Sequence, residues 1–171
     1  MLLNDLIAAN KETLSESVAM LKDITDAAYT AITAPFAASI GKHMRHISDH
    51  YLQLFNGIAD GKIDYDARVR NESVEENRSA MIELLSDISA KFSGIQPDPK
   101  KTVSVVLSVD EYSKTPAVES TLARELVFLQ SHTTHHCAII SGILKIQGLY
   151  VPENFGIAAS TRKYDQRQAA H

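Results

Sequence analysis

The chain has 171 residues, 44% of them hydrophobic and 22% charged, with a net charge of -4, which is typical of one soluble domain that buries its own core. Because it has no block of Lys and Arg residues and no apolar run of membrane-spanning length, we expect neither nucleic acid nor a membrane as its partner. Its single cysteine, Cys137, excludes an intrachain disulfide, and the lack of a signal-peptide pattern further favours a cytoplasmic location.

The first part of the chain predicts two helices. Residues 3–32 carry apolar side chains at alternating spacings of three and four, which is the pattern of a helix in a bundle. Pro35 interrupts this pattern, because proline has no backbone N–H to donate inside a helix. A second helix is predicted over residues 36–59, and the polar residues 60–72 are predicted to form a loop.

The middle of the chain predicts a third helix and a small β-hairpin. Ser73 to Glu76 has the pattern of a capping box, with Ser73 as the N-cap residue, and Gly94 is suited to end the helix. A proline-containing loop at 96–100 follows. Strict alternation of apolar residues then predicts a strand over 102–109, and residues 112–118 are its expected antiparallel partner.

The last predicted helix runs from near Glu119 to Gln147, and the tail after it is expected to begin irregularly. Four helices with one short β-hairpin insertion before the last helix make an all-α four-helix bundle. We therefore expect residues 1–150 to form the bundle domain and residues 151–171 to form a C-terminal tail that packs on or near it.

Histidines on two of the predicted helices indicate a metal site. His132 and His136 are four residues apart, so they lie one turn apart on one helix face and can chelate a single ion. On the second helix, His43, His46 and His50 lie within about 60° of one another on a helical wheel. His46 lies at the border of the apolar stripe, as do His132 and His136, and this position favours it as the third ligand.

The remaining candidates have less specific predicted roles. His43 and His50 lie in the centre of their apolar stripe and are expected to line the pocket. Glu125 shares the helix sector of the two later histidines, and a general base, a partner of a ligand and a salt-bridge carboxylate all stay open for it. Cys137 is expected to be a buried, inert thiol, and Asp49 is expected to be solvated.

Residues 35–50 and 125–140 resemble the two histidine motifs of the DinB-like superfamily, which includes the YfiT-like proteins and the bacillithiol and mycothiol S-transferases. Proteins of this superfamily are four-helix bundles that hold a divalent metal ion with one histidine from the second helix and a His-x-x-x-His motif from the last. The resemblance therefore implies His46, His132 and His136 as ligands. An arginine often follows the last motif in the family, and Cys137 takes that place here.

Ligation by imidazole alone disfavours Mg and Ca, but it does not choose between Zn, Ni, Fe and Cu. We expect one divalent transition metal ion, Zn or Ni, as the cofactor. Three hypotheses stay open: an enzyme that transfers a low-molecular-weight thiol to an electrophile, a metal-dependent hydrolase, and a metal-binding bundle without turnover. The resemblance supports the first two together. We expect a small-molecule substrate, with a low-molecular-weight thiol as the partner that the resemblance implies, and a homodimer stays open.

Overall fold

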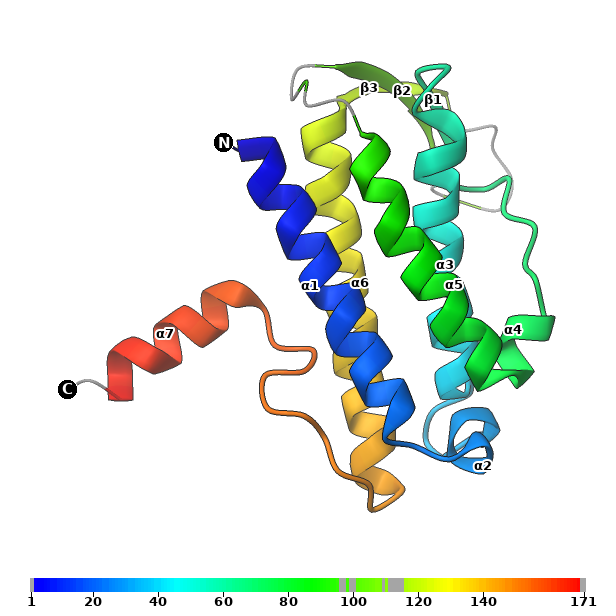
Figure 1. The fold of residues 1–171 in the computed structure, drawn as a ribbon, viewed down its shortest axis with the longest axis vertical. Coiled ribbons are helices and arrows are strands. Elements are labelled where there is room, and N and C mark those ends of the chain that lie inside the picture. Colours follow the sequence, from blue (N-terminus) through cyan, green and yellow to red (C-terminus); the bar gives the residue numbers. More distant parts are fainter. Residues whose placement is uncertain (1, 96–97, 99–100, 109, 111–115, 170–171) are drawn as a thin grey trace.

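The structure is a computed structural model, and it describes residues 2–95, 98, 101–108, 110 and 116–169. Within these ranges the protein is mostly helical, and its long helices run alongside one another (Figure 1): α1 (Leu2–Lys22), α3 (Ile40–Gly57), α5 (Arg78–Lys91) and α6 (Leu122–Ile146). Helices α1 and α3 each pack against both α5 and α6. The apolar faces of all four helices meet in one core, whose fully buried residues include Leu14, Tyr51, Leu85 and Leu129.

Shorter elements connect these helices: α2 (Asp26–Thr30), β1 (Lys62–Asp64), α4 (Ser73–Glu76), the 3-10 turn η1 (Phe92–Gly94), β2 (Thr102–Val106), β3 (Val118–Thr121) and the C-terminal α7 (Ala159–Ala169). None of the helices in the described ranges is long and apolar enough to cross a membrane.

The three strands form one sheet at an end of the helical body, in the order β1-β2-β3 (Figure 1). Strands β2 and β3 pair antiparallel, with Val103 opposite Ser120, as the predicted hairpin requires. Strand β1 pairs parallel with β2, so the prediction of a loop throughout residues 60–72 is wrong. The predicted partner strand over 112–118 lies largely outside the described residues, since 112–115 are not among them.

The start of the last long helix also differs from the prediction. Residues 118–121 form strand β3, and α6 begins at Leu122 rather than near Glu119. Thr121 has an extended backbone and its side chain accepts a hydrogen bond from the backbone N–H of Arg124. Threonine satisfies an otherwise unpaired N–H in this way, so the hairpin ends and the helix begins at the same residue.

Residues 3–32 form two helices instead of the single helix predicted. Helix α1 ends at Lys22, and the side chain of Thr25 accepts a hydrogen bond from Ala28 N to begin α2. Arg78 from α5 stabilises this break, because it donates to the carbonyl oxygen of Leu21 (2.8 Å) and forms an ion pair with Asp26 (2.7 Å). A residue distant in sequence therefore takes part in ending the helix.

The predicted capping box at Ser73 is wrong. The Ser73 hydroxyl donates to Oδ1 of Asn71 (2.7 Å), and no side chain caps α4. The helix predicted from Ser73 is divided after Glu76, and Asn77 is the N-cap residue of α5, since its Oδ1 accepts from Ala80 N (2.9 Å). In the same way, Ser39 caps α3, which begins at Ile40 rather than at residue 36.

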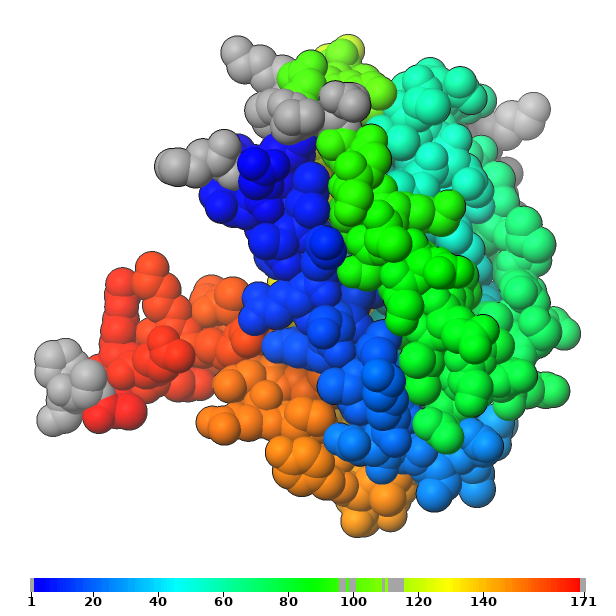
Figure 2. All heavy atoms as spheres, in the orientation of Figure 1, coloured from blue at the N-terminus to red at the C-terminus, as the bar shows by residue number. Residues whose placement is uncertain are grey.

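The C-terminal tail begins irregularly and ends in helix α7, which was not predicted. Gly156 has a φ of 74°, and a Cβ placed on it would lie 2.4 Å from the backbone nitrogen of Ala138, so the chain lies directly against α6 at this point. Beyond it, α7 extends away from the long helices (Figures 1 and 2) and buries none of its residues.

Candidate metal centre

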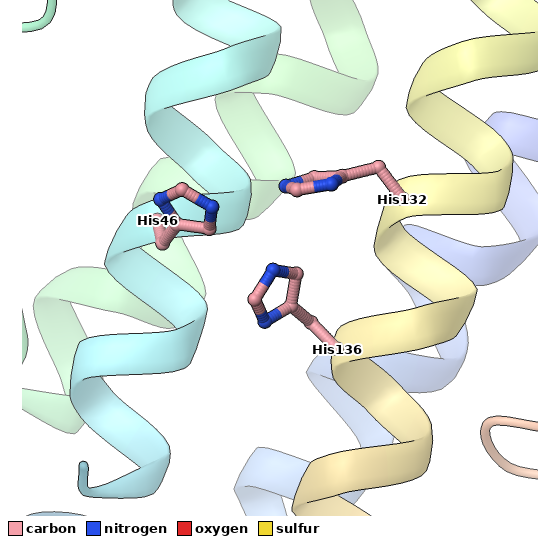
Figure 3. A group of neighbouring side chains, drawn as sticks. All are labelled: His46, His132 and His136. Carbon is pink, nitrogen blue, oxygen red and sulfur yellow. The ribbon is translucent and has the colours of Figure 1, made fainter. Parts of the chain in front are cut away.

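Three half-buried histidines from two helices converge between α3 and α6. His46 extends from α3, and His132 and His136 extend from α6, with their rings turned toward one another (Figure 3). One nitrogen of each ring lies within 4.8 Å of the other two, and the ring centroids are 4.6 to 5.0 Å apart. The structure thus brings together the three residues that the sequence predicted as ligands, in a cluster that could hold a metal ion.

Buried hydrogen bonds fix α3 against α6 close to this cluster. The Tyr51 hydroxyl donates to Oδ1 of Asn10 (2.8 Å) and accepts from the Thr133 hydroxyl (3.2 Å). Asn10 in turn donates to the carbonyl oxygen of Leu126 (3.0 Å). These bonds join α1, α3 and α6 through satisfied polar groups, and Thr133 adjoins His132 in sequence, so the helix register at the cluster is set by specific contacts.

All three histidines of the cluster are neutral at pH 7. Burial, reinforced by the neighbouring rings, lowers the pKa of His46 to about 3 and the pKa values of His132 and His136 to about 4 each. Neutral imidazoles keep a lone pair free for coordination. Nε2 of His132 is buried and has no hydrogen-bond partner, which is uncommon for a buried polar atom and is accounted for if this nitrogen binds an ion.

Two further histidines border the cluster through hydrogen bonds. Nδ1 of His43 lies 3.0 Å from Nδ1 of His136, which leaves Nε2 of His136 for an ion. His50 uses both of its nitrogens: Nδ1 donates to the carbonyl oxygen of His46 (2.9 Å), and Nε2 accepts from Nη1 of Arg68 (3.3 Å). His50 is therefore engaged beside the cluster and is not among the three residues that could share an ion.

Glu125 is not part of the histidine cluster but lies close to residues that border it. Its carboxylate is fully buried and accepts hydrogen bonds from the hydroxyls of Tyr65 (2.9 Å) and Ser120 (2.6 Å) and from Nη1 of Arg124 (3.1 Å). The Tyr65 ring stacks on the ring of His50. Glu125 thus reaches the histidines through Tyr65 and His50, and a catalytic role for it stays a prediction.

Other candidates of the sequence analysis have clear positions. Cys137 is 1% exposed, and burial raises the pKa of its thiol to about 12. The prediction that Asp49 is solvated is wrong, since it is buried and pairs with Arg45 (3.1 Å). Sequence analysis did not identify Arg68 or Tyr65, because both lie in a segment without helical or strand periodicity, and no local pattern indicated them.

The donor set fits a divalent transition metal ion. Three neutral imidazoles and no carboxylate make up the cluster in the described part of the chain. This set suits borderline ions such as Zn²⁺ and Ni²⁺, whereas Mg²⁺ and Ca²⁺ prefer oxygen ligands.

Comparisons with known proteins add little to this geometry. No family model matches the chain, and no solved structure matches it. A stretch of 109 residues, 62% of this chain, is 32% identical to FK506-binding protein 5 of Rhizopus delemar. The stretch covers 28% of that protein, so the chain spans less than a third of the length of the curated relative it matches. The DinB-like resemblance therefore stays a prediction.

Proposed function

We propose that this protein is a four-helix bundle of the DinB-like type that binds one Zn²⁺ or Ni²⁺ ion and transfers a low-molecular-weight thiol to an electrophilic small molecule. The observation that carries the metal site is the convergence of His46, His132 and His136 as neutral imidazoles, with one buried nitrogen that has no other partner. The thiol chemistry is supported by the resemblance of the two histidine motifs to those of the thiol S-transferases.

The chain's own residues have distinct tasks in this proposal. A bound divalent ion would supply a Lewis acid that lowers the pKa of a thiol or of water. His43 holds the ring of His136 through the 3.0 Å contact between their Nδ1 atoms, and such partners fix the orientation of a ligand and its tautomer. His50 also borders a ligand, because it bonds to the backbone of His46 on one side and to the guanidinium of Arg68 on the other.

Metal content tests the site. Protein prepared without an affinity tag should contain close to one equivalent of Zn or Ni by elemental analysis, and His132→Ala and His136→Ala should each contain far less. His135→Ala is the matched control, because His135 is the neighbouring residue on the same helix and is exposed. Full metal content in both His132→Ala and His136→Ala would show that the site assignment is wrong.

Cobalt substitution tests the chemistry. If the ion accepts a thiol, 2-mercaptoethanol at millimolar concentration should produce a sulfur-to-cobalt charge-transfer band in the Co²⁺-substituted protein. A metal-dependent hydrolase, the second candidate from the same site, would bind simple anions without this band, and a non-catalytic bundle would respond to neither. Bound Co²⁺ without the band would therefore exclude the thiol transferase.

A further inference from the structure

Arg68 is held beside the histidine cluster by the segment that connects β1 to α4. The backbone just before it is fixed from two sides. The carboxylate of Asp66 accepts hydrogen bonds from both the backbone N–H (2.6 Å) and the hydroxyl (2.7 Å) of Ser108, and Gln53 from α3 donates to the carbonyl oxygen of Ala67 (3.2 Å). Arg68 is therefore a half-buried side chain on an anchored backbone, unlike a freely moving surface arginine.

The guanidinium of Arg68 is only partly satisfied. Its Nη1 donates to Nε2 of His50 (3.3 Å), but its Nε is buried and has no hydrogen-bond partner. Among the residues that the structure describes, no acid forms an ion pair with it. The N–H groups of Nε and Nη2 lie side by side on one edge of the guanidinium, and Nη1 is not part of that edge. Such an edge binds the two oxygens of a carboxylate or a phosphate at the same time.

The positive charge of Arg68 acts on the cluster itself. The ring of His50, which contacts Arg68, lies with its centroid 4.4 Å from that of His132 and 4.5 Å from that of His46. Besides burial, the charge of Arg68 contributes to the lowered pKa values of these three histidines. The ring of His50 thus lies between the guanidinium and the two proposed ligands His46 and His132.

The carboxylate of Asp66 counteracts the lowering of the pKa of His50, but it already accepts two hydrogen bonds from Ser108. The cluster consists of histidines alone, and the nearby carboxylate of Glu125 is bound by Tyr65, Ser120 and Arg124. A divalent ion, which the proposed function requires, would add to the positive charge of Arg68. A small ligand with one group at the ion and an anionic group at Arg68 would balance both.

The geometry points to Arg68 as the anchor of a carboxylate on the small molecule that the three-histidine site binds. This inference rests on the proposed function, because the other end of the small molecule is taken to bind the metal ion. It adds the substrate class, a small carboxylic acid. Arg68 is assigned to binding the carboxylate, through the unpaired Nε and its neighbouring Nη2.

Two thiols that differ in a carboxylate test this assignment in the Co²⁺-substituted protein. The charge-transfer band should saturate at about tenfold lower concentration with 3-mercaptopropionate than with 2-mercaptoethanol, because charge-assisted hydrogen bonds to the carboxylate add affinity. In Arg68→Gln this preference should disappear, so that the two thiols saturate the band at similar concentrations. Arg68→Lys keeps the charge without the planar fork and should keep only part of the preference.

Arg70→Gln is the matched control, since Arg70 is exposed in the same segment, and it should keep the full preference. Circular dichroism establishes that each variant is folded. A wild-type protein without the preference, or an Arg68→Gln variant that retains it, would overturn the assignment.

A second measurement is independent of metal and thiol. Saturation-transfer NMR of propionate with chelator-treated protein should give a signal that Arg68→Gln abolishes and Arg70→Gln retains. If neither thiol gives a charge-transfer band, the proposed function fails, and this signal still decides the role of Arg68. The absence of an Arg68-dependent propionate signal, or stronger binding of inorganic phosphate than of propionate, would overturn the carboxylate assignment.

Discussion

Burial determines the protonation of the clustered histidines and of Cys137. The histidines of the cluster lose proton affinity because the charged imidazolium is poorly solvated there, and their hydrogen bonds then select the tautomer. His50 illustrates this: its Nδ1 must carry the proton, since the acceptor on that side is a carbonyl oxygen, and its Nε2 must accept from Arg68. The same principle, acting on an acid, keeps Cys137 protonated.

Cys137 should therefore be unreactive in the folded protein. Its thiol is 1% exposed, its pKa is raised to about 12 by burial, and its sulfur lies 3.6 Å from the hydroxyl of Ser17. At about pH 8, Ellman's reagent should react with the native protein far more slowly than with protein unfolded in guanidinium chloride, which serves as the control. Rapid, stoichiometric modification of the native protein would contradict this prediction.

At the level of elements, the residue at which a helix begins depends on which side chain accepts a hydrogen bond from its first free backbone N–H groups. The long helices α3, α5 and α6 are capped by Ser39, Asn77 and Thr121, each through a side-chain oxygen that accepts from a backbone N–H three residues later. Ser73 has the sequence pattern of such a cap and does not act as one. Ser73, at the start of α4, and Asn77, before α5, therefore allow a direct comparison of a predicted cap with an observed one.

Replacing Asn77 by Ala should lower the free energy of unfolding by about 1 kcal/mol, because the first turn of α5 loses its acceptor. Ser73→Ala should cost much less, because the exposed Ser73 hydroxyl bonds only to the exposed side chain of Asn71. Urea denaturation followed by circular dichroism measures both values. A larger loss in Ser73→Ala than in Asn77→Ala would favour the capping box over the observed cap.

For the whole molecule, stability and metal binding involve the same interior. The long helices share one continuous core that includes residues from each of them, such as Leu14, Met44, Leu85 and Ile140. The histidine cluster lies between α3 and α6 at this core, so an ion bound there would link the two helices in the folded state only. By mass action, such an ion should raise the melting temperature, and we expect the core to keep the metal-free protein folded.

The metal-free protein should lose stability between about pH 6.5 and pH 4. Burial lowers the pKa of His46 to about 3 and those of His50, His132 and His136 to about 4, all below the ordinary value of 6.5. As the pH falls through this window, the unfolded chain binds protons at these rings and the folded chain does not. The free energy of unfolding must therefore fall with decreasing pH and reach its full value above pH 6.5.

Urea denaturation of chelator-treated protein at several pH values measures this slope. The protein should be folded at pH 8, and a His136→Ala variant should show a shallower slope because one such ring is missing. A free energy of unfolding that is constant from pH 7 to pH 4.5 would contradict the prediction, and a loss of helical circular dichroism at pH 8 would show that the core needs the ion.

Local spacing in the sequence was sufficient for the long helices and for the histidine pair. The period of apolar residues identified the segments that became α1, α3, α5 and α6, because a helix that packs on a core must repeat its apolar face at 3.6 residues per turn. The separation of His132 and His136 by one turn follows from the same geometry, and so does the common face of His43, His46 and His50 on α3.

Tertiary structure decided the features that depend on contacts between distant segments. The break after α1 involves Arg78, strand β1 exists because β2 is available to pair with it, and Arg45, which pairs with Asp49 on its own helix, also pairs with Glu75 of α4. Arg68 reaches His50 from a segment without any periodicity. Sequence spacing carries information about neighbours within three or four residues, whereas these contacts are made only when the chain folds back on itself.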